Sequence, residues 1–312
     1  MVFFWPVLLN AHVFKEITFK SSGINCHARL YTPKAANRNG AGIVLGHGLC
    51  GTIDTGLPDY AEAFANAGFH ALVFDYRGFG LSDGTPRQFV SVPRQRQDWL
   101  RAIATLRGHA NVDADSIGLW GISFSGGHVV HMAHKDPKIK AIVAQVPMID
   151  PVLTLNVSEY ERGIEKTESL QGQIVQWLKK RWFTNKPEML LAVRRHDDDV
   201  ALLATEEAKI YAKLGGPSWR NEVHPDSFIF GKISDNNASL LTDDLSVPVL
   251  LQMGKTDRLV SNEAIVNFAR RCGPLARLST YDAGHFTLLQ NNALQKQAIK
   301  EAISFYDEHL TV

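Results

Sequence analysis

Apolar positions along the chain fall into two alternating patterns. Short continuous apolar runs, typical of strands buried on both faces of a sheet, occupy residues 41–48, 70–76, 116–120, 139–147, 247–253 and 276–282. Between them, apolar residues have the spacing of one helix face at 59–69, 93–108, 126–135, 262–272 and 294–309. Strands that alternate with helices in this way predict an α/β fold, with a mostly parallel central sheet and helices on both of its faces.

The beginning of the chain departs from this alternation. Two strand-like runs at 13–22 and 24–33 are separated by a Ser-Gly turn signal, which predicts an antiparallel hairpin. The apolar stretch at 1–12 is too short to cross a bilayer, and no Lys or Arg precedes it. We therefore expect it to pack on the fold or to lie on a membrane surface, rather than to act as a secretory signal.

The alternation is interrupted between about Asp150 and Leu245. This segment lacks strand signals, and residues 171–183 and 186–195 have amphipathic helical spacing. An insertion of this size on a regular α/β frame usually covers the site, although a surface decoration is the alternative. We predict a core domain made of residues 1–150 and 246–312, and a helical cap at residues 151–245.

Composition limits the function further. Of the 312 residues, 45% are hydrophobic and 21% are charged, and the net charge of +1 lacks the basic excess of a nucleic-acid-binding protein. The three cysteines, Cys26, Cys50 and Cys272, are too few and too widely spaced for a disulfide framework or a zinc pattern. We expect a cytoplasmic location, no nucleic-acid partner and no membrane span. The sequence does not decide between a monomer and a homodimer.

The stretch GISFSGG at 121–127 lies between a predicted strand and a predicted helix. In the pattern G-x-S-x-G, a tight strand-to-helix turn pushes a serine hydroxyl out over the edge of the sheet. The residues two before and two after that serine must be small. Gly121 and Ser125 fill those positions around Ser123. Ser125 departs from the usual glycine but is small enough for the turn, so Ser123 is the predicted nucleophile.

A serine hydroxyl needs a general base, which in turn needs a carboxylate to orient it. Asp257 in GKTDRLV and His285 in DAGHF each follow a predicted strand. Because the carboxyl ends of parallel strands meet at the edge where ligands bind, we expect both side chains near Ser123. Asp282 is the alternative acid, but it follows the other strand, and we expect it to cap a turn.

An oxyanion hole is the fourth part that this chemistry needs. One donor would be the backbone N–H of Phe124, which directly follows the nucleophile. The other would come from the glycine-rich loop at 45–51, where we select the N–H of Leu49.

The motifs HGLCG, DYRGFGLSDG, GISFSGG, GKTDRLV and DAGHF occur in this order along the chain. From His47 to the C-terminus they resemble those of α/β-hydrolase-fold serine hydrolases. The GxSxSGG elbow and the WRNEV segment at 219–223 are similar to dienelactone-hydrolase-like and polyketide-transferase-like proteins. The resemblance implies the α/β-hydrolase fold and a catalytic triad in the order Ser, Asp, His.

These observations predict a cofactor-independent serine hydrolase that cleaves an ester, thioester or lactone. We expect a small-molecule substrate with a largely apolar acyl group, and neither a cofactor nor a metal. An acyltransferase that uses the same triad is the main alternative. A C–C bond hydrolase, a cofactor-free peroxidase and a catalytically inactive ligand-binding protein on this fold are the others.

Other residues have simpler interpretations. His128, His131 and His134 lie three apart on one helix, where three ligands converge poorly on an ion, so we expect structural or surface roles. The HDDD run at 196–199 is expected to be solvated surface. The loop at 75–84 fits no phosphate-binding pattern and predicts a structured turn near the site.

Four aromatic residues of the insertion could line an acyl pocket. They are Trp177, Trp182, Phe183 and Trp219. Because their spacing is helical, the core of the cap is the expected place for each of them. Cys50 lies beside the predicted oxyanion loop, and we expect it to act as a small apolar packing residue.

Overall fold

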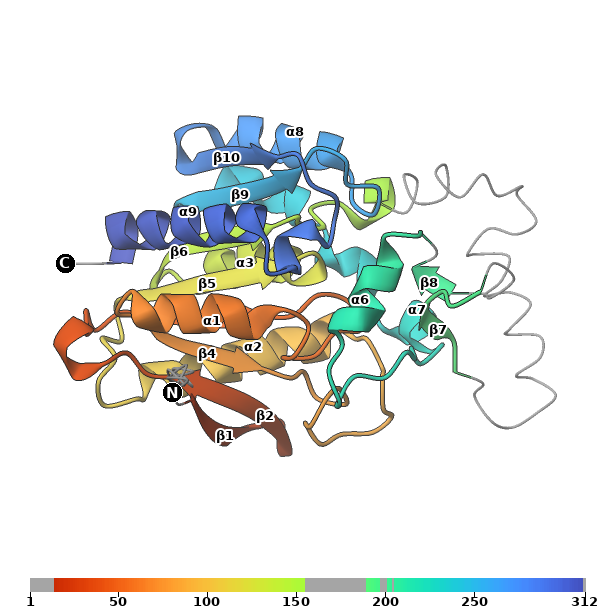
Figure 1. The fold of residues 1–312 in the computed structure, drawn as a ribbon, viewed down its shortest axis with the longest axis horizontal. Coiled ribbons are helices and arrows are strands. Elements are labelled where there is room, and N and C mark those ends of the chain that lie inside the picture. The colour runs from red at the N-terminus through yellow and green to blue at the C-terminus, as the bar shows by residue number, and fades with distance from the viewer. Residues whose placement is uncertain (1–13, 155–188, 197–200, 204, 311–312) are drawn as a thin grey trace, which may run out of the picture.

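The centre of the molecule is one eight-stranded sheet (Figure 1). The computed structural model describes residues 14–154, 189–196, 201–203 and 205–310. The strand order is β1-β2-β4-β3-β5-β6-β9-β10. The strands are β1 (Phe14–Ser21), β2 (Ile24–Tyr31), β3 (Gly42–Gly46), β4 (His70–Phe74), β5 (Ile117–Ile122), β6 (Ile139–Gln145), β9 (Val249–Gly254) and β10 (Ala276–Tyr281). β1 and β2 form an antiparallel hairpin, β2 is antiparallel to β4, and the strands from β4 to β10 are parallel.

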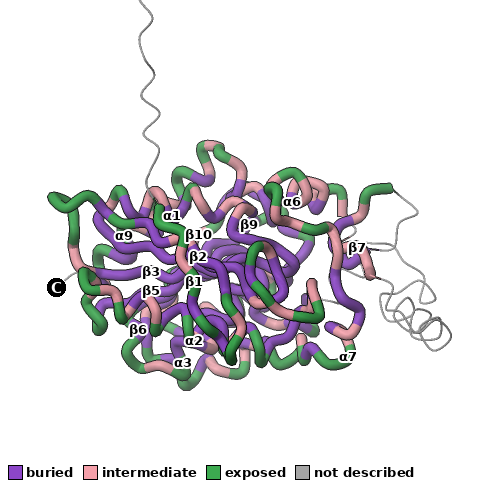
Figure 2. Tube along the Cα trace, turned by 90° about the horizontal axis from the view of Figure 1, so that it is seen from below, coloured by how far each residue is buried: buried purple, intermediate pink, exposed green. Residues whose placement is uncertain are grey.

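Helices cover both faces of this sheet. The principal ones are α1 (Leu57–Asn66), α2 (Val92–Arg107), α3 (Phe124–Lys135), α8 (Asn262–Cys272) and α9 (Ala293–Leu310). Successive strand residues point to opposite faces, so β3 contributes to two cores. Ile43 and Leu45 share a core with Tyr60 of α1, whereas Val44 shares the other core with Trp99 of α2. Figure 2 shows the buried positions gathered along the strands at the centre.

The predicted α/β alternation is confirmed in order and in type. Each predicted strand and helix of the frame is present, and the predicted N-terminal hairpin pairs Phe14 with Tyr31. α3 begins at Phe124, two residues before the predicted start, because the helix follows the turn at residue 123 without a spacer. Within the described part of the chain, no helix has the length and apolar character that a membrane span needs. The apolar stretch at 1–12 lies outside the described residues.

The insertion carries short elements that lie together at the end of the sheet toward which β5 points (Figure 1). They include β7 (Leu191–Val193), β8 (Ala201–Leu203), α6 (Ala208–Leu214) and α7 (Ser227–Phe230). β7 and β8 pair in parallel as a separate two-stranded sheet. The prediction that the insertion lacks strands is therefore wrong, as is the predicted helix at 186–195 within its described part. The helix predicted at 171–183 lies outside the described residues.

Tertiary hydrogen bonds explain why this part of the insertion is extended. The Val193 N–H donates to Asn221 Oδ1 at 2.7 Å, and Asn221 Nδ2 donates to the Val193 carbonyl at 2.8 Å. Leu190 also forms an antiparallel bridge with Val223. The periodicity of a short apolar run does not distinguish a buried strand from a buried helix, so these distant partners decide the conformation. The boundaries of the cap at 151 and 245 stay a prediction.

Asp75, directly after β4, organises the glycine-rich loop at 75–84. Its carboxylate accepts hydrogen bonds from the N–H groups of Ile53 at 2.8 Å and Leu81 at 3.0 Å. Gly80 has a φ of 48°, and a Cβ there would lie 2.2 Å from Asp75 Oδ2. The loop is thus closed around a carboxylate of the protein itself, and it is the structured turn that the sequence predicts.

His70, at the start of β4, is a fully buried histidine without hydrogen-bonded ring nitrogens. Among the described residues, neither Nδ1 nor Nε2 has a partner, and the ring lies 5.1 Å from that of His109. Burial, together with the charges of His109 and Arg38, lowers the pKa of His70 to about 4. The unfolded chain binds a proton at this residue near its ordinary pKa of about 6.5. His70 therefore contributes stability above pH 6.5 that is lost as the pH falls toward 4.

We expect the substitution His70→Leu to make the free energy of unfolding less sensitive to acid. The measurement is urea denaturation between pH 7.5 and 4.5, on the wild type and on His70→Leu. His134→Gln changes an exposed histidine and is the matched control, expected to keep the wild-type slope. Identical slopes for all three proteins would show that His70 does not titrate differently in the folded and unfolded states.

Candidate active site

Ser123 lies in the turn between β5 and α3 with a strained backbone. Its φ is 55° and its ψ is −115°, a conformation that residues with a side chain rarely adopt. A Cβ at position 121 would lie 2.3 Å from the carbonyl oxygen of Ser125, so glycine is the only residue type that fits at this position. The Ser123 N–H is held by the carbonyl of Gln145 in β6, at 2.9 Å. The chain thus forms the predicted strand-to-helix elbow, with Ser123 at its apex.

The small residues after Ser123 are also fixed by their surroundings. A Cβ on Gly126 would lie 2.5 Å from Pro147 Cβ. Ser125 is fully buried, and its hydroxyl bonds with the Tyr76 hydroxyl and with the carbonyl of His47. Ser125 is therefore more than a tolerated replacement for glycine, because its side chain ties the start of α3 to the loop after β3.

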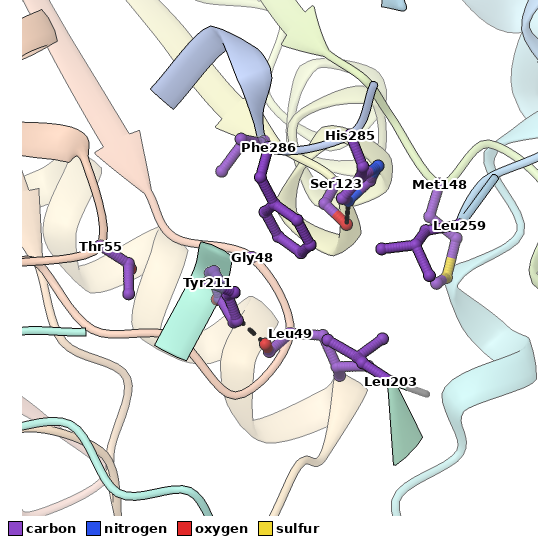
Figure 3. Close-up of a pocket in the computed structure, with 11 residues that line it drawn as sticks. Gly48, Leu49, Thr55, Ser123, Met148, Leu203, Tyr211, Leu259, His285 and Phe286 are labelled. Atoms are coloured by element: carbon purple, nitrogen blue, oxygen red, sulfur yellow. Dashed lines mark hydrogen bonds between the residues drawn. The ribbon is translucent and has the colours of Figure 1, made fainter. Parts of the chain in front are cut away.

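The three residues predicted as a triad lie in hydrogen-bond contact, and Figure 3 shows the contact between Ser123 and His285. Ser123 Oγ is 2.9 Å from His285 Nε2, and His285 Nδ1 is 2.7 Å from Asp257 Oδ2. All three side chains are buried, and they follow β5, β10 and β9 respectively. Burial alone would lower the pKa of His285, but the carboxylates of Asp257 and Glu207 raise it above its usual value. This arrangement can take a proton from a serine hydroxyl and stabilise the resulting imidazolium.

The loop after β9 orients the Asp257 carboxylate. Its Oδ1 accepts hydrogen bonds from the N–H groups of Leu259 at 2.8 Å and Val260 at 3.2 Å. Its other oxygen is left to face the imidazole. Asp282, the alternative acid, is exposed and forms an ion pair of 2.9 Å with Lys255. The structure therefore brings Asp257 to His285, and it directs Asp282 to the surface.

Leu49 and Phe124, the predicted oxyanion donors, flank Ser123. Phe124 is the first residue of α3, where backbone N–H groups have no partner within the helix. The loop after β3 approaches Ser123 so closely that a Cβ on Gly48 would lie 3.3 Å from Ser123 Cβ. Leu49, the next residue, lines the same pocket as Ser123. The use of these two N–H groups as an oxyanion hole stays a prediction.

The insertion braces the loop that carries Leu49. The Tyr211 hydroxyl donates to the Leu49 carbonyl at 3.0 Å, and Trp219 Nε1 donates to the Cys50 carbonyl at 2.9 Å. Trp219 thus packs beside this loop and is not among the described residues that line the pocket. Burial raises the pKa of the Cys50 thiol to about 12, so Cys50 stays protonated near neutral pH. Trp177, Trp182 and Phe183 lie outside the described residues.

A small pocket opens at Ser123 and His285 (Figure 3). The described residues that line it are Gly48, Leu49, Thr55, Ile122, Ser123, Met148, Leu203, Tyr211, Leu259, His285 and Phe286. Most of these side chains are apolar or aromatic, and the polar groups of Ser123 and His285 lie together. Apolar walls with a few converging polar groups are typical of small-molecule sites.

Several pocket residues were not predicted. Leu259 and Phe286 lie next to the triad in the GKTDRLV and DAGHF motifs, so their position in the sequence was an available signal. Met148 follows β6, and Leu203 and Tyr211 lie in the insertion. None of the three belongs to a sequence motif that could have indicated the pocket. They reach the pocket only through tertiary packing.

The three histidines of α3 do not form a metal site. Among the residues that the structure describes, no group of three or more His, Cys, Asp and Glu side chains could hold a metal ion. His128 is fully buried, and its Nε2 lies 2.9 Å from Gln95 Oε1. Burial also lowers the pKa of His131 to about 3. Of the HDDD run, only His196 is described, and it is exposed.

Comparison with known proteins gives the family of this chain. Residues 37–292 match the protein family described as Serine aminopeptidase, S33. The quorum-quenching protein AidA of Acinetobacter baumannii (strain MDR-ZJ06) is 40% identical over 135 residues, which are 43% of this chain and 44% of AidA.

Two fungal relatives match at lower identity. The thiohydrolase aneE of Aspergillus aculeatus is 34% identical over 44% of this chain and 42% of its own length. The acyltransferase drtE of Aspergillus calidoustus is 36% identical over 43% of each chain. Each of these alignments, like that with AidA, spans less than half of the relative.

The crystal structure of the α/β hydrolase GrgF from Penicillium sp. sh18 superimposes with a TM-score of 0.77. The match covers 96% of this chain and 99% of GrgF at 21% sequence identity. At this identity the likeness concerns the fold, and it confirms the predicted α/β-hydrolase fold.

Proposed function

Because the chain belongs to the serine aminopeptidase S33 family of α/β hydrolases, we propose that it cleaves an ester, thioester or lactone through an acyl-enzyme on Ser123. The observation that carries this proposal is the unbroken hydrogen-bond chain from Ser123 through His285 to Asp257. A strained serine, a histidine of raised pKa and a buried carboxylate in this order are the parts of a nucleophilic acyl-transfer site.

In the proposed mechanism, Ser123 Oγ attacks the carbonyl carbon while His285 Nε2 takes the hydroxyl proton. The Asp257 carboxylate stabilises the imidazolium that forms, and the N–H groups of Leu49 and Phe124 stabilise the oxyanion. His285 then gives its proton to the leaving group, which departs and leaves the acyl group on Ser123. A water molecule, activated by His285 as base, releases the acid and restores the serine.

No step of this mechanism routes through a cofactor or a metal, since the side chains themselves supply the nucleophile, base and acid. We therefore propose that the enzyme is cofactor-independent. We also propose a cytoplasmic location, because Cys26, Cys50 and Cys272 are all buried, free thiols that suit a reducing compartment.

The lining of the pocket supports an apolar acyl group as the substrate. Each methylene that enters the pocket should add ~0.8 kcal/mol, or roughly fourfold in kcat/KM, until the space is filled. Within this class we propose a thioester as one reacting group, since the relative aneE is named a thiohydrolase.

The experiment is a series of p-nitrophenyl esters and acyl thioesters from acetyl to decanoyl. We expect kcat/KM to rise with chain length, and Met148→Ala, which alters the pocket wall, to change this profile. Leu240→Ala is the matched control, because Leu240 is 73% exposed and does not line the described pocket. A flat profile, or a preference for acetyl that Met148→Ala does not alter, would contradict an apolar acyl pocket. Turnover that persists in Ser123→Ala would contradict the acyl-enzyme itself.

Acyl transfer is the second candidate, and the acyltransferase relative drtE favours it. Transfer and hydrolysis share the acyl-enzyme and differ only in the nucleophile that releases it. The same ester assay in the presence of added alcohols or amines separates them by product analysis. A transferred acyl product that exceeds the free acid at millimolar acceptor identifies a transferase, and free acid alone identifies a hydrolase.

A further inference from the structure

One carboxylate of the insertion lies against the loop that carries His285. Glu207, directly before α6, accepts a hydrogen bond from the Phe286 N–H at 2.9 Å. The neighbouring His285 lies close enough for its charge to act on this carboxylate. A Cβ at position 284 would lie 2.1 Å from Glu207 Oε1, so the carboxylate packs directly on Gly284. Glu207 therefore contacts the backbone on both sides of His285, at Gly284 and at Phe286.

This contact adds a constraint from the insertion to the loop that carries His285. The loop joins β10 to the short helix at Thr287–Leu289, and within it the Gly284 N–H donates to Thr287 Oγ1 at 3.0 Å. The hydrogen bond from the Phe286 N–H and the packing of the carboxylate on Gly284 hold the peptide planes on either side of His285. The direction of these planes determines where the imidazole of His285 points between Ser123 and Asp257.

The same segment of the insertion also contacts the loop that carries Leu49, on the other side of the site. Tyr211, one helical turn after Glu207, donates its hydroxyl to the carbonyl of Leu49. The Tyr211 ring stacks on Phe286 with 4.8 Å between the centroids. α6 thus contacts both the loop of the general base and the loop of the predicted oxyanion donor.

The charged groups that face Glu207 are those of the triad. Burial raises the pKa of Glu207, and the negative charge of Asp257 also raises it. The N–H groups of Phe286 and His285 and the positive charge of His285 act in the opposite direction. His285 in turn faces two carboxylates, Asp257 through a direct hydrogen bond and Glu207 through space. When ionised, both favour the protonated imidazole.

We propose that Glu207 is a positioning residue for the general base, and that the insertion aligns the catalytic histidine in addition to covering the substrate. Its carboxylate holds the His285 backbone in place, and its charge adds to that of Asp257 in stabilising the imidazolium. This inference rests on the proposed function, since the base is needed only if Ser123 is the nucleophile.

The test compares Glu207→Gln and Glu207→Ala with the wild type. Glu206→Gln is the matched control, because Glu206 is the adjacent carboxylate but is exposed and pairs with Lys209. We expect Glu207→Ala to lower kcat by roughly 10- to 10²-fold with a smaller change in KM, since misplacement of a catalytic group acts on the chemical step. Glu207→Gln keeps one acceptor oxygen and should recover part of this loss.

The pH profile distinguishes this role from a merely structural one. Loss of the charge should move the acid limb of kcat/KM to lower pH in both Glu207 variants, because His285 then has a lower pKa. Glu206→Gln should leave kcat and the acid limb where they are in the wild type. An unchanged acid limb and kcat in the two Glu207 variants would overturn the proposal.

The imidazole titration of His285, followed by NMR, gives the same answer without catalysis. A lower His285 pKa in Glu207→Gln than in the wild type supports the proposal, and an equal pKa contradicts it. Thermal melting of each variant separates a fold defect from an effect on the base. If the wild type neither turns over esters nor reacts with a fluorophosphonate, the proposed function fails, and the titration still decides whether Glu207 acts on His285.

Discussion

Replacing Ser123 with alanine should lower kcat by roughly 10⁴- to 10⁶-fold, because no other group can form the acyl-enzyme. His285→Ala should cause a loss of similar size. The two residues act as one unit, since the hydroxyl is activated only through the 2.9 Å contact with the imidazole. The double variant should therefore be little worse than either single one. The measurement is the steady-state rate with a p-nitrophenyl ester.

The fold should survive these changes. Alanine at position 123 must adopt the same positive φ as serine, so the backbone strain of the elbow is matched. Thermal melting of the variants serves as the control and should show transitions close to that of the wild type. Losses that multiply in the double variant would contradict the shared role of Ser123 and His285.

Asp257→Asn should lower kcat by about 10⁴-fold, because an amide can donate to His285 Nδ1 and favour the wrong tautomer. Asp257 Oδ2 lies 2.7 Å from His285 Nδ1, where a carboxylate can only accept a hydrogen bond, so it favours the tautomer with the proton on Nδ1 and leaves Nε2 free to accept from Ser123. The change preserves the shape of the side chain, so the loss reports on hydrogen bonding and charge. The measurement is kcat on the ester that the wild type cleaves best.

Asp282→Asn is the matched control for this substitution. Asp282 was the competing acid in the sequence, and in the structure it is exposed and paired with Lys255. We expect its replacement to leave kcat within about twofold, because exposed ion pairs contribute little. If Asp282→Asn is inactive and Asp257→Asn is not, the carboxylate has been assigned to the wrong residue.

The fold and the proximity of Ser123, His285 and Asp257 could be predicted because both follow from local signals, and the catalytic role of these residues stays a prediction. The carboxyl ends of parallel strands meet at one edge of the sheet. Ser123, Asp257 and His285 each follow such a strand, so the sequence predicts that they lie close together. The motif requires a small residue at position 121, and the structure shows why: a Cβ on Gly121 would collide with the carbonyl oxygen of Ser125.

The parts that could not be predicted depend on contacts between distant segments. Leu191–Val193 is extended because Asn221 bonds with its backbone, and a short apolar run does not show this. Glu207 and Tyr211 reach the site because α6 folds back onto two loops, and neither residue lies in a recognisable motif. Ser125 could be read only as small, since the hydroxyl's partner Tyr76 is 49 positions away.

The most direct test of the account is the reaction of the intact protein with a fluorophosphonate, followed by mass spectrometry. Only a serine activated by a base should react with such a probe. The account predicts one adduct per chain, located on the peptide that contains Ser123, and no adduct in Ser123→Ala. Absence of an adduct from the wild type, or an adduct that persists in Ser123→Ala, would contradict an activated Ser123.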